Sequence, residues 1–247
     1  MSTILLPLPT LGFDPTEAAV PWQILTGQGH SVVFATPDGK PGQADTRMLL
    51  GNDLGLLRPL LQADQNGRSA YDAMSAASAY ATPISYGQAR TFEVDAVLLP
   101  GGHAKGMREY LESPELQAIV SRAFERDLPV GAICHGVVLA ARSRATTGKS
   151  VLYGRKTTAL TKDLELTAWA LTALWLGDYY RTYAVTVQSE VVASLARPQD
   201  FIHGPLALVR DSPGNEDRGF VVRDGNYVSA RWPGDAHRFA NEFSKLL

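Results

Sequence analysis

The only cysteine of this 247-residue chain, Cys134, lies in the segment Leu128-Pro-Val-Gly-Ala-Ile-Cys-His-Gly-Val-Val-Leu-Ala-Ala141. The first half of the segment is apolar and β-branched and predicts a buried strand, whereas the Val, Leu and Ala residues of the second half predict a helix. The chain must therefore turn sharply at Ile133 to Gly136 and hold the thiol over the first helical turn, the position of a nucleophile in α/β folds. The unpaired amides and the dipole of that turn favour an anion such as a thiolate.

Alternating strands and helices continue on both sides of this corner. Strands are predicted at residues 3–8, 31–35, 94–100 and 157–160, helices at 17–26, 113–125 and 236–247, and a hairpin at 219–229 around an Asp-Gly turn. This alternation is typical of an α/β fold with a doubly wound, mostly parallel sheet. Residues 47–93, with short helices at 54–61 and 71–80, and residues 164–211, rich in Trp and Tyr, break the rhythm. We interpret both as insertions that cover the crevice, and we expect the aromatic side chains to pack.

Composition limits the class of protein. A chain with 45% hydrophobic and 19% charged residues can bury a full core, so we expect one domain over residues 1–247. The net charge of -2, with scattered Lys and Arg, excludes a nucleic-acid footprint. We find neither a signal peptide nor a membrane span and expect a cytoplasmic protein. A single cysteine excludes a disulfide framework, and the histidine spacing predicts no metal site. We expect no cofactor.

Two further segments should open onto the same crevice. The corner at Val94 to His103 is glycine-rich and follows a predicted strand, so the Gly102 amide could approach the sulfur, while His103 ends the turn. Glu17 begins the first helix directly after the first strand. A protonated Glu17 could donate a hydrogen bond to the sulfur and lower the pKa of the thiol. Making the thiolate dominant at pH 7 requires a fall of about two pKa units, roughly 2.7 kcal/mol.

Each of these assignments has a structural alternative. Cys134 could be a small buried hydrophobic residue. Asp14 or Thr16 could cap the first helix, with Glu17 only decorating its first turn.

His135, next to the cysteine, could relay protons if a carboxylate orients its ring. Asp163 and Glu165 are the nearest candidates, because they follow the strand predicted at residues 157–160. The alternative is that both are solvated charges that open a helix.

Four motifs occur in order over the first 160 residues: Glu17-Ala-Ala-Val-Pro-Trp-Gln-Ile-Leu, Gly29-His-Ser-Val-Val-Phe-Ala-Thr-Pro37, Leu99-Pro-Gly-Gly-His103 and Ala132-Ile-Cys-His-Gly136. Together they resemble the ThiJ/PfpI superfamily, and particularly its branch of stress-induced glyoxalases and chaperone-like proteins. The resemblance implies a flavodoxin-like sandwich and commonly a homodimer. It also implies that Cys134 is the nucleophile, that Glu17 is its proton partner and that His135 is the adjacent imidazole. The backbone N–H groups of Gly102 and His135 would then donate to an oxyanion. Where some members have an aspartate after a Phe-Pro pair, this chain has Leu160-Thr-Lys162.

The resemblance favours a cofactor-independent glyoxalase III-type enzyme that acts on methylglyoxal or related small reactive carbonyl compounds. Deglycase activity is the same addition on another carbonyl. The alternatives are a holdase chaperone or a redox sensor that uses Cys134 oxidation. Isocyanide hydratase and peptidase activities are more remote, and no His-x-Glu pair exists for glutamine amidotransfer.

Overall fold

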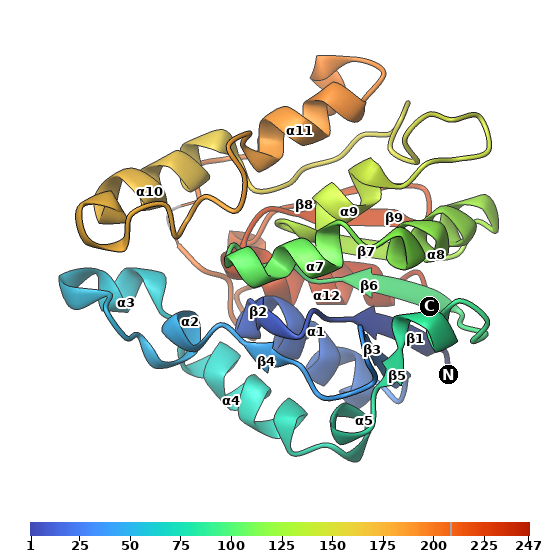
Figure 1. The fold of residues 1–247 in the computed structure, drawn as a ribbon, viewed down its shortest axis with the longest axis horizontal. Coiled ribbons are helices and arrows are strands. Elements are labelled where there is room, and N and C mark those ends of the chain that lie inside the picture. Colours follow the sequence, from blue (N-terminus) through green and yellow to red (C-terminus); the bar gives the residue numbers. More distant parts are fainter. Residues whose placement is uncertain (208) are drawn as a thin grey trace.

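The computed structural model describes residues 1–207 and 209–247. Within them, a seven-stranded sheet has the order β5-β3-β1-β6-β7-β9-β8, and every pairing in it is parallel except that of β8 with β9 (Figure 1). The strands of this sheet are β1 (Thr3–Pro7), β3 (Ser31–Thr36), β5 (Ile84–Ser85), β6 (Ala96–Leu99), β7 (Val130–Ile133), β8 (Val221–Asp224) and β9 (Tyr227–Ala230). A smaller parallel pair joins β2 (Leu11–Phe13) to β4 (Gln43–Ala44).

Helices cover both faces of the sheet, which makes the fold doubly wound. One layer contains α1 (Pro15–Gly27) and α12 (Ala236–Ser244), and the other contains α8 (Pro114–Glu125) and α9 (Gly136–Arg142) (Figure 1). The strands between them are almost wholly apolar and buried, as expected for parallel strands covered on both faces. The remaining helices are α2 (Thr46–Leu50), α3 (Arg58–Leu61), α4 (Gln65–Ser75), α5 (Ser78–Ala81), α6 (Tyr86–Ala89), α7 (Arg108–Leu111), α10 (Lys162–Leu176) and α11 (Val187–Ser194).

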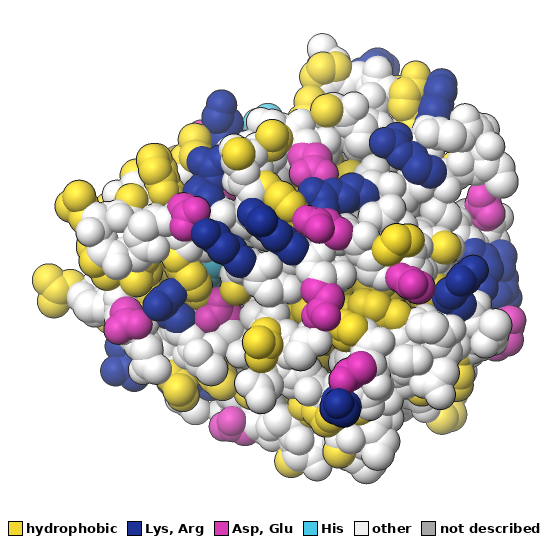
Figure 2. Space-filling model, viewed as in Figure 1, with side chains coloured by type: hydrophobic (Ala, Val, Ile, Leu, Met, Phe, Trp, Pro, Cys, Tyr) yellow, Lys and Arg dark blue, Asp and Glu magenta, His cyan; other side chains and the backbone are white. Residues whose placement is uncertain are grey.

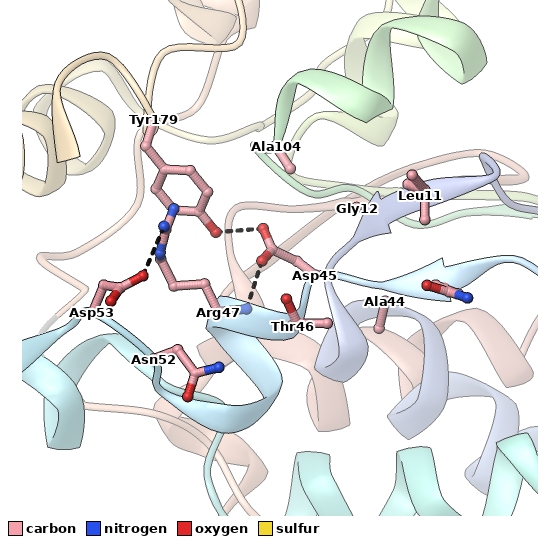
Figure 3. A pocket seen from close by; sticks show the side chains of 11 residues that line it. Leu11, Gly12, Ala44, Asp45, Thr46, Arg47, Asn52, Asp53, Ala104 and Tyr179 are labelled. Atoms are coloured by element: carbon pink, nitrogen blue, oxygen red, sulfur yellow. Dashed lines mark hydrogen bonds and ion pairs between the residues drawn. The ribbon is translucent and has the colours of Figure 1, made fainter.

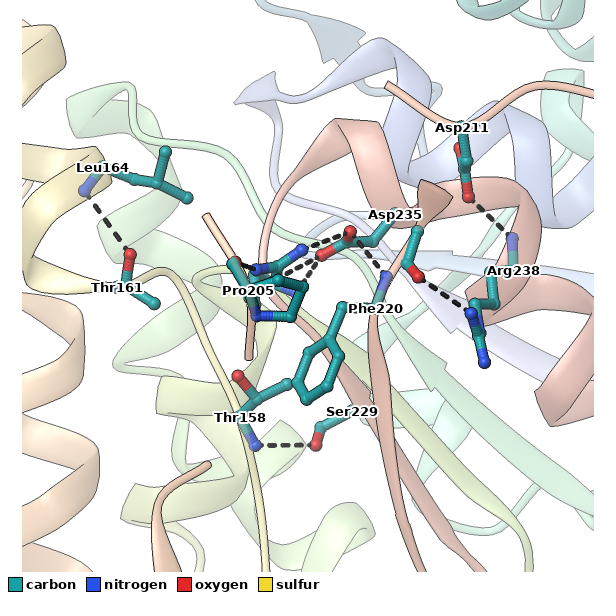
Figure 4. Close-up of polar contacts among 11 residues, drawn as sticks. Thr158, Thr161, Leu164, Pro205, Asp211, Phe220, Ser229, Asp235 and Arg238 are labelled. Atoms are coloured by element: carbon teal, nitrogen blue, oxygen red, sulfur yellow. Dashed lines mark hydrogen bonds and ion pairs between the residues drawn. The ribbon is translucent and has the colours of Figure 1, made fainter. Parts of the chain in front are cut away.

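The predicted fold class is confirmed, but one predicted strand is wrong. Residues 157–160 form only an isolated bridge, from Thr157 to Phe201. The Thr158 N–H, which lies near β9, donates to the Ser229 hydroxyl at 2.9 Å instead of to a backbone carbonyl (Figure 4). Because a side chain replaces the ladder hydrogen bond, the segment does not continue the sheet.

The two insertions pack only in part against the rest of the chain. Helix α4, the longest part of the first insertion, packs against α1. In the second insertion Tyr180 packs, whereas Trp169 and Trp175 of α10 are 37% and 50% exposed, contrary to the expectation that the aromatic residues are buried. Position 208 of this insertion lies outside the described residues. No helix in the described part of the chain has both the length and the apolarity needed to cross a membrane.

A buried ion pair anchors the end of the second insertion to the sheet. Arg231, directly after β9, donates to Asp235 at 2.9 Å, and its Nη1 donates to the carbonyl oxygen of Pro205 (Figure 4). The Phe220 N–H also donates to Asp235. Because both charged groups are satisfied by hydrogen bonds, their burial is tolerated and the segment at Pro205 is held beside β9.

Candidate active site

Cys134 occupies the predicted corner between β7 and α9. Its backbone is left-handed, with φ +57°, which costs a non-glycine residue roughly 1 to 2 kcal/mol. Its N–H donates to the Ala230 carbonyl at 3.0 Å. The turn also requires Gly136, because a Cβ there would lie 2.1 Å from the Leu99 carbonyl oxygen. Neighbouring strands therefore hold the strained residue in place.

Glu17 faces the same corner from the first turn of α1. Asp14 caps the helix, with its side chain accepting from the N–H groups of Thr16 and Glu17, so capping does not need the Glu17 carboxyl. Glu17 is fully buried, and its Oε2 accepts the Gly101 N–H at 3.0 Å. Its Oε1 has no hydrogen-bond partner of good geometry among the described residues, but the carboxyl lies close enough to Cys134 for the two side chains to influence each other's pKa as hydrogen-bonding neighbours.

Glycine at position 101 permits this approach. A Cβ on Gly101 would lie 2.6 Å from Glu17 Oε2 and 2.7 Å from the backbone nitrogen of His135. Three segments that are distant in the sequence thus meet within van der Waals distance.

Burial controls the charge of the carboxyl groups. Desolvation, followed by the nearby Asp14 charge, raises the pKa of Glu17 well above its ordinary value. Desolvation also raises the pKa of Asp14 to about 6, although the Glu17 N–H that it accepts opposes the shift. At neutral pH Asp14 is therefore largely ionised, whereas burial favours the protonated form of Glu17.

The thiol pKa moves in the opposite direction to the prediction. Burial raises the pKa of the Cys134 thiol well above its ordinary value. Glu17, when it is ionised, and Asp14 raise this pKa further through their negative charge, while the backbone N–H of His135 lowers it. The predicted resting thiolate is therefore wrong. Cys134 is a thiol at rest, and a nucleophilic role requires a neighbouring group to accept its proton.

His135 presents a ring nitrogen to the thiol. Its Nδ1 is 3.5 Å from the Cys134 Sγ, and its Nε2 is 3.1 Å from the hydroxyl of Thr182. The ring is buried, and desolvation lowers the pKa of His135 to about 3, with smaller contributions from His103 and Arg142. The imidazole is therefore neutral at physiological pH.

The expectation that Asp163 or Glu165 orients His135 is wrong. Asp163 is exposed on α10, and Glu165 binds the Val187 N–H at 2.8 Å and Arg181 at 3.2 Å. Thr182 takes the position at the ring. The sequence does not point to Thr182, because an isolated threonine within an aromatic insertion belongs to no motif.

The residues of the glycine-rich corner have separate roles. Gly102 has φ +148°, and a Cβ there would lie 2.8 Å from the Gly12 carbonyl oxygen, so the close packing requires glycine. Its amide as an oxyanion donor stays a prediction. His103 does more than end a turn: its ring stacks on Tyr180 with centroids 4.4 Å apart, and its carbonyl accepts the Thr182 hydroxyl.

The reactive groups are enclosed. Cys134 is 4% exposed, and it lines neither of the two described cavities. A separate cavity of about 420 Å³ is lined by residues that include Gly12, Ala104, Asp45 and Tyr179 (Figure 3). Tyr179 donates to Asp45 in this cavity, and Arg47 pairs with Asp53 at 3.1 Å. Among residues 1–207 and 209–247, no three His, Cys, Asp or Glu side chains converge as metal ligands.

Comparison with known proteins places this chain in a family. The model of the ThiJ/PfpI family-like proteins matches residues 8–205. The deglycase TK1284 of Thermococcus kodakarensis is 27% identical over 203 residues, which cover 79% of this chain and 92% of the relative. An uncharacterized protein of Schizosaccharomyces pombe is 33% identical over 116 residues, 46% of this chain but only 42% of that relative.

A solved structure supports the same placement at the level of the fold. The crystal structure of glyoxalase III from Candida albicans superposes with a TM-score of 0.67 and 19% identity, covering 99% of this chain and 97% of the other. With a family match over most of its length and this shared fold, the chain belongs to the ThiJ/PfpI family.

Proposed function

We propose that the protein is a cysteine-dependent, cofactor-independent glyoxalase III-type enzyme that converts methylglyoxal or related 2-oxoaldehydes into 2-hydroxy acids. One observation carries the proposal: the Cys134 thiol is enclosed between a protonated carboxyl, Glu17, and a neutral imidazole, His135. An acid and a base on either side of one nucleophile suit both the addition of a thiol to a carbonyl and the later proton shuttling. The enclosure favours a small substrate.

The first step is the addition of sulfur to the aldehyde carbon. The S–H proton passes to His135 Nδ1 as the S–C bond forms, and the carbonyl π electrons move to oxygen. The protonated Glu17 carboxyl supplies a proton to that oxygen, and the Gly102 amide is our candidate for an additional donor. The product is a neutral hemithioacetal on Cys134.

The second stage isomerises and releases the product. Glu17, now a carboxylate, removes the C1 proton while the His135 imidazolium protonates the C2 oxygen, which gives a neutral enediol. Glu17 then returns its proton to C2 as the C1 hydroxyl proton passes to His135, which leaves a thioester on Cys134. Water hydrolyses the thioester, releasing the 2-hydroxy acid and regenerating the thiol. The overall change adds one water to methylglyoxal and gives lactate, so no external oxidant or reductant is required.

The test is lactate formation from methylglyoxal by the purified protein without glutathione. Cys134→Ala should abolish the activity, and the fold should survive, because the variant deletes only one buried sulfur atom. Circular dichroism and thermal unfolding verify the fold. An Ala variant with wild-type turnover would refute the nucleophile assignment.

A deglycase activity would use the same addition on the carbonyl of an early glycation adduct. The similarity to a protein named a deglycase supports including such adducts as substrates in the same assay. Cys134 lies in an enclosed site, so adducts on free amino acids should react faster than adducts on a folded protein.

The exposed face of α10 favours a second candidate function, that of a holdase. Trp169, Leu171, Leu174 and Trp175 are 37%, 45%, 97% and 50% exposed, whereas the buried residues of this helix are Glu165 and Thr172. Figure 2 shows hydrophobic side chains at the end of the molecule where Figure 1 places α10. An apolar patch of this kind can bind unfolded chains. Suppression of client aggregation by the Cys134→Ala protein would separate this function from catalysis.

A further inference from the structure

We propose that Thr182 is a positioning residue for the active site: it binds the proton on Nε2 of His135 and so leaves Nδ1 free to accept the proton of the Cys134 thiol. The inference rests on the proposed function only in that the thiol must lose its proton for the reaction. It assigns a role to the segment between α10 and α11, which the catalytic motifs do not include.

The direction of the hydrogen bonds follows from counting protons. The Thr182 hydroxyl has one proton, and its Oγ1 lies 2.6 Å from the carbonyl oxygen of His103, which can only accept. The hydroxyl therefore donates to His103. Toward Nε2 of His135, at 3.1 Å, Oγ1 can then only accept, so the ring carries its proton on Nε2.

Whether the other ring nitrogen, Nδ1, carries a proton follows from the charge of the ring. A neutral imidazole has one N–H, and here it is on Nε2, so Nδ1 has a free lone pair. This nitrogen lies 3.5 Å from the Cys134 sulfur. The thiol can thus donate to Nδ1, and attack on a carbonyl moves the proton along a hydrogen bond that already exists. The opposite tautomer would place an N–H against the thiol and remove the base.

The structure also holds Thr182 firmly. Its side chain is fully buried, and its carbonyl oxygen accepts two hydrogen bonds from the Arg108 guanidinium, at 3.0 and 2.5 Å. Lys105 and Asp178 form an ion pair at 2.8 Å between the same two segments. These contacts join the second insertion to the loop after β6, so the threonine reaches the ring from a fixed backbone.

The charged and titratable groups around the ring do not offer another partner for Nε2. His103 and Arg142 act on His135 electrostatically and lower its pKa. Arg142 itself is paired with Glu190 at 2.6 Å and with the Tyr183 hydroxyl at 3.0 Å. Among the described residues, Thr182 is the group recorded within hydrogen-bond distance of Nε2.

The experiment compares Thr182→Val with Thr182→Ser. Valine has nearly the same shape but no acceptor, whereas serine keeps the hydroxyl. Thr172→Val is the matched control, because Thr172 is a fully buried threonine of the same insertion whose hydroxyl binds Ala168 in its own helix. The tautomer of His135 is read from the 15N chemical shifts of its ring, assigned by their loss in His135→Gln.

Wild type, Thr182→Ser and Thr172→Val should show a neutral ring protonated on Nε2. Thr182→Val should shift the ring toward the Nδ1–H tautomer and lower kcat for lactate formation about 10- to 100-fold with little change in KM, by analogy with partial loss of a general base. Serine should restore most of the rate. Alkylation of Cys134 by iodoacetamide at pH 7 should slow in the valine variant and stay unchanged in the control.

Two results would overturn the proposal: a wild-type ring protonated on Nδ1, or a folded valine variant that keeps both the wild-type tautomer and the wild-type alkylation rate. Neither readout needs methylglyoxal, so they remain decisive if the wild-type protein makes no lactate, which would refute the proposed function alone. If the valine variant does not fold, the wild-type and serine spectra still decide the tautomer.

Discussion

Replacing Glu17 by glutamine separates proton transfer from simple support of the thiol. The wild-type carboxyl accepts the Gly101 N–H on Oε2 and lies close enough to Cys134 to influence the pKa of the thiol. Glutamine can accept the same N–H with its carbonyl oxygen and donate to the sulfur with its amide. Because burial favours the protonated form of the wild-type carboxyl, the neutral amide keeps both the shape of the site and the charge of that form.

The expected magnitudes differ for stability, reactivity and turnover. With the Gly101 hydrogen bond kept, the free energy of unfolding should change by less than about 1 kcal/mol below pH 4.5, the ordinary pKa of the carboxyl. At higher pH the variant should be the more stable protein, because the raised pKa of Glu17 costs the wild type stability there. An ionised Glu17 raises the thiol pKa, and glutamine cannot ionise, so alkylation of Cys134 at pH 7 should be no slower than in wild type. The amide cannot exchange a proton, so lactate formation should fall ~10² to 10⁴-fold, about 2.7 to 5.4 kcal/mol in the activation free energy.

The assay measures lactate release and iodoacetamide alkylation on the same preparations between pH 6 and 9. Glu115→Gln is the matched control, because Glu115 lies in the first turn of α8, is partly exposed and is bound to Ser113 rather than to the site. This control should keep full activity. If Glu17→Gln also keeps full activity, Glu17 only supports the thiol, and proton transfer must be assigned to His135.

Two predictions concern the fold around the site. Asp14→Asn should keep the helix cap but remove a carboxyl whose pKa is about 6 when folded and 3.8 in its ordinary state. Because the folded protein holds the Asp14 proton more tightly than the unfolded chain does, protonation of Asp14 stabilises the fold by about 3 kcal/mol. This contribution is complete below about pH 4 and is lost as the pH rises through 6. Urea unfolding should thus find the variant more stable than the wild type above pH 6 and equally stable below pH 4. The pKa of Cys134, measured by alkylation, should be lower in the variant. Identical stability of the two proteins at every pH would contradict the burial argument. Gly136→Ala should destabilise the protein by about 1 to 3 kcal/mol or more in thermal unfolding, because its Cβ meets backbone atoms of Leu99 and Pro100, whereas Gly27→Ala, with no atom within 4 Å of its Cβ, should be neutral or slightly stabilising.

Much of the site followed from local patterns. Apolar strands that run into helices, at residues 3–26 and 128–141, place Glu17 and Cys134 beyond the carboxyl ends of β1 and β7, two parallel strands separated by β6, at the edge where a doubly wound sheet brings such residues together. The hairpin at β8 and β9 followed equally from its Asp-Gly turn. These features depend on residues close in sequence, so the local order of residue types predicts them.

The predictions that were wrong concern features that depend on contacts between distant segments. Residues 157–160 have the composition of a strand, but a hydrogen bond from the Thr158 N–H to the Ser229 side chain takes the place of strand pairing. The direction of the thiol pKa depends on how completely Cys134 is desolvated and on the distance to Asp14, which no local pattern gives.

The sequence by itself determined the doubly wound fold, the corner that holds Cys134 and the presence of Glu17 beside it, because periodicity and turn chemistry are local properties. Tertiary structure alone decided that Thr182, rather than Asp163 or Glu165, meets His135. The chain separation between residues 135 and 182 is bridged by packing of the second insertion on the loop after β6, through Arg108 and Lys105. Which polar group reaches a buried ring depends on that packing, and the chemical type of a side chain does not reveal where its backbone will lie.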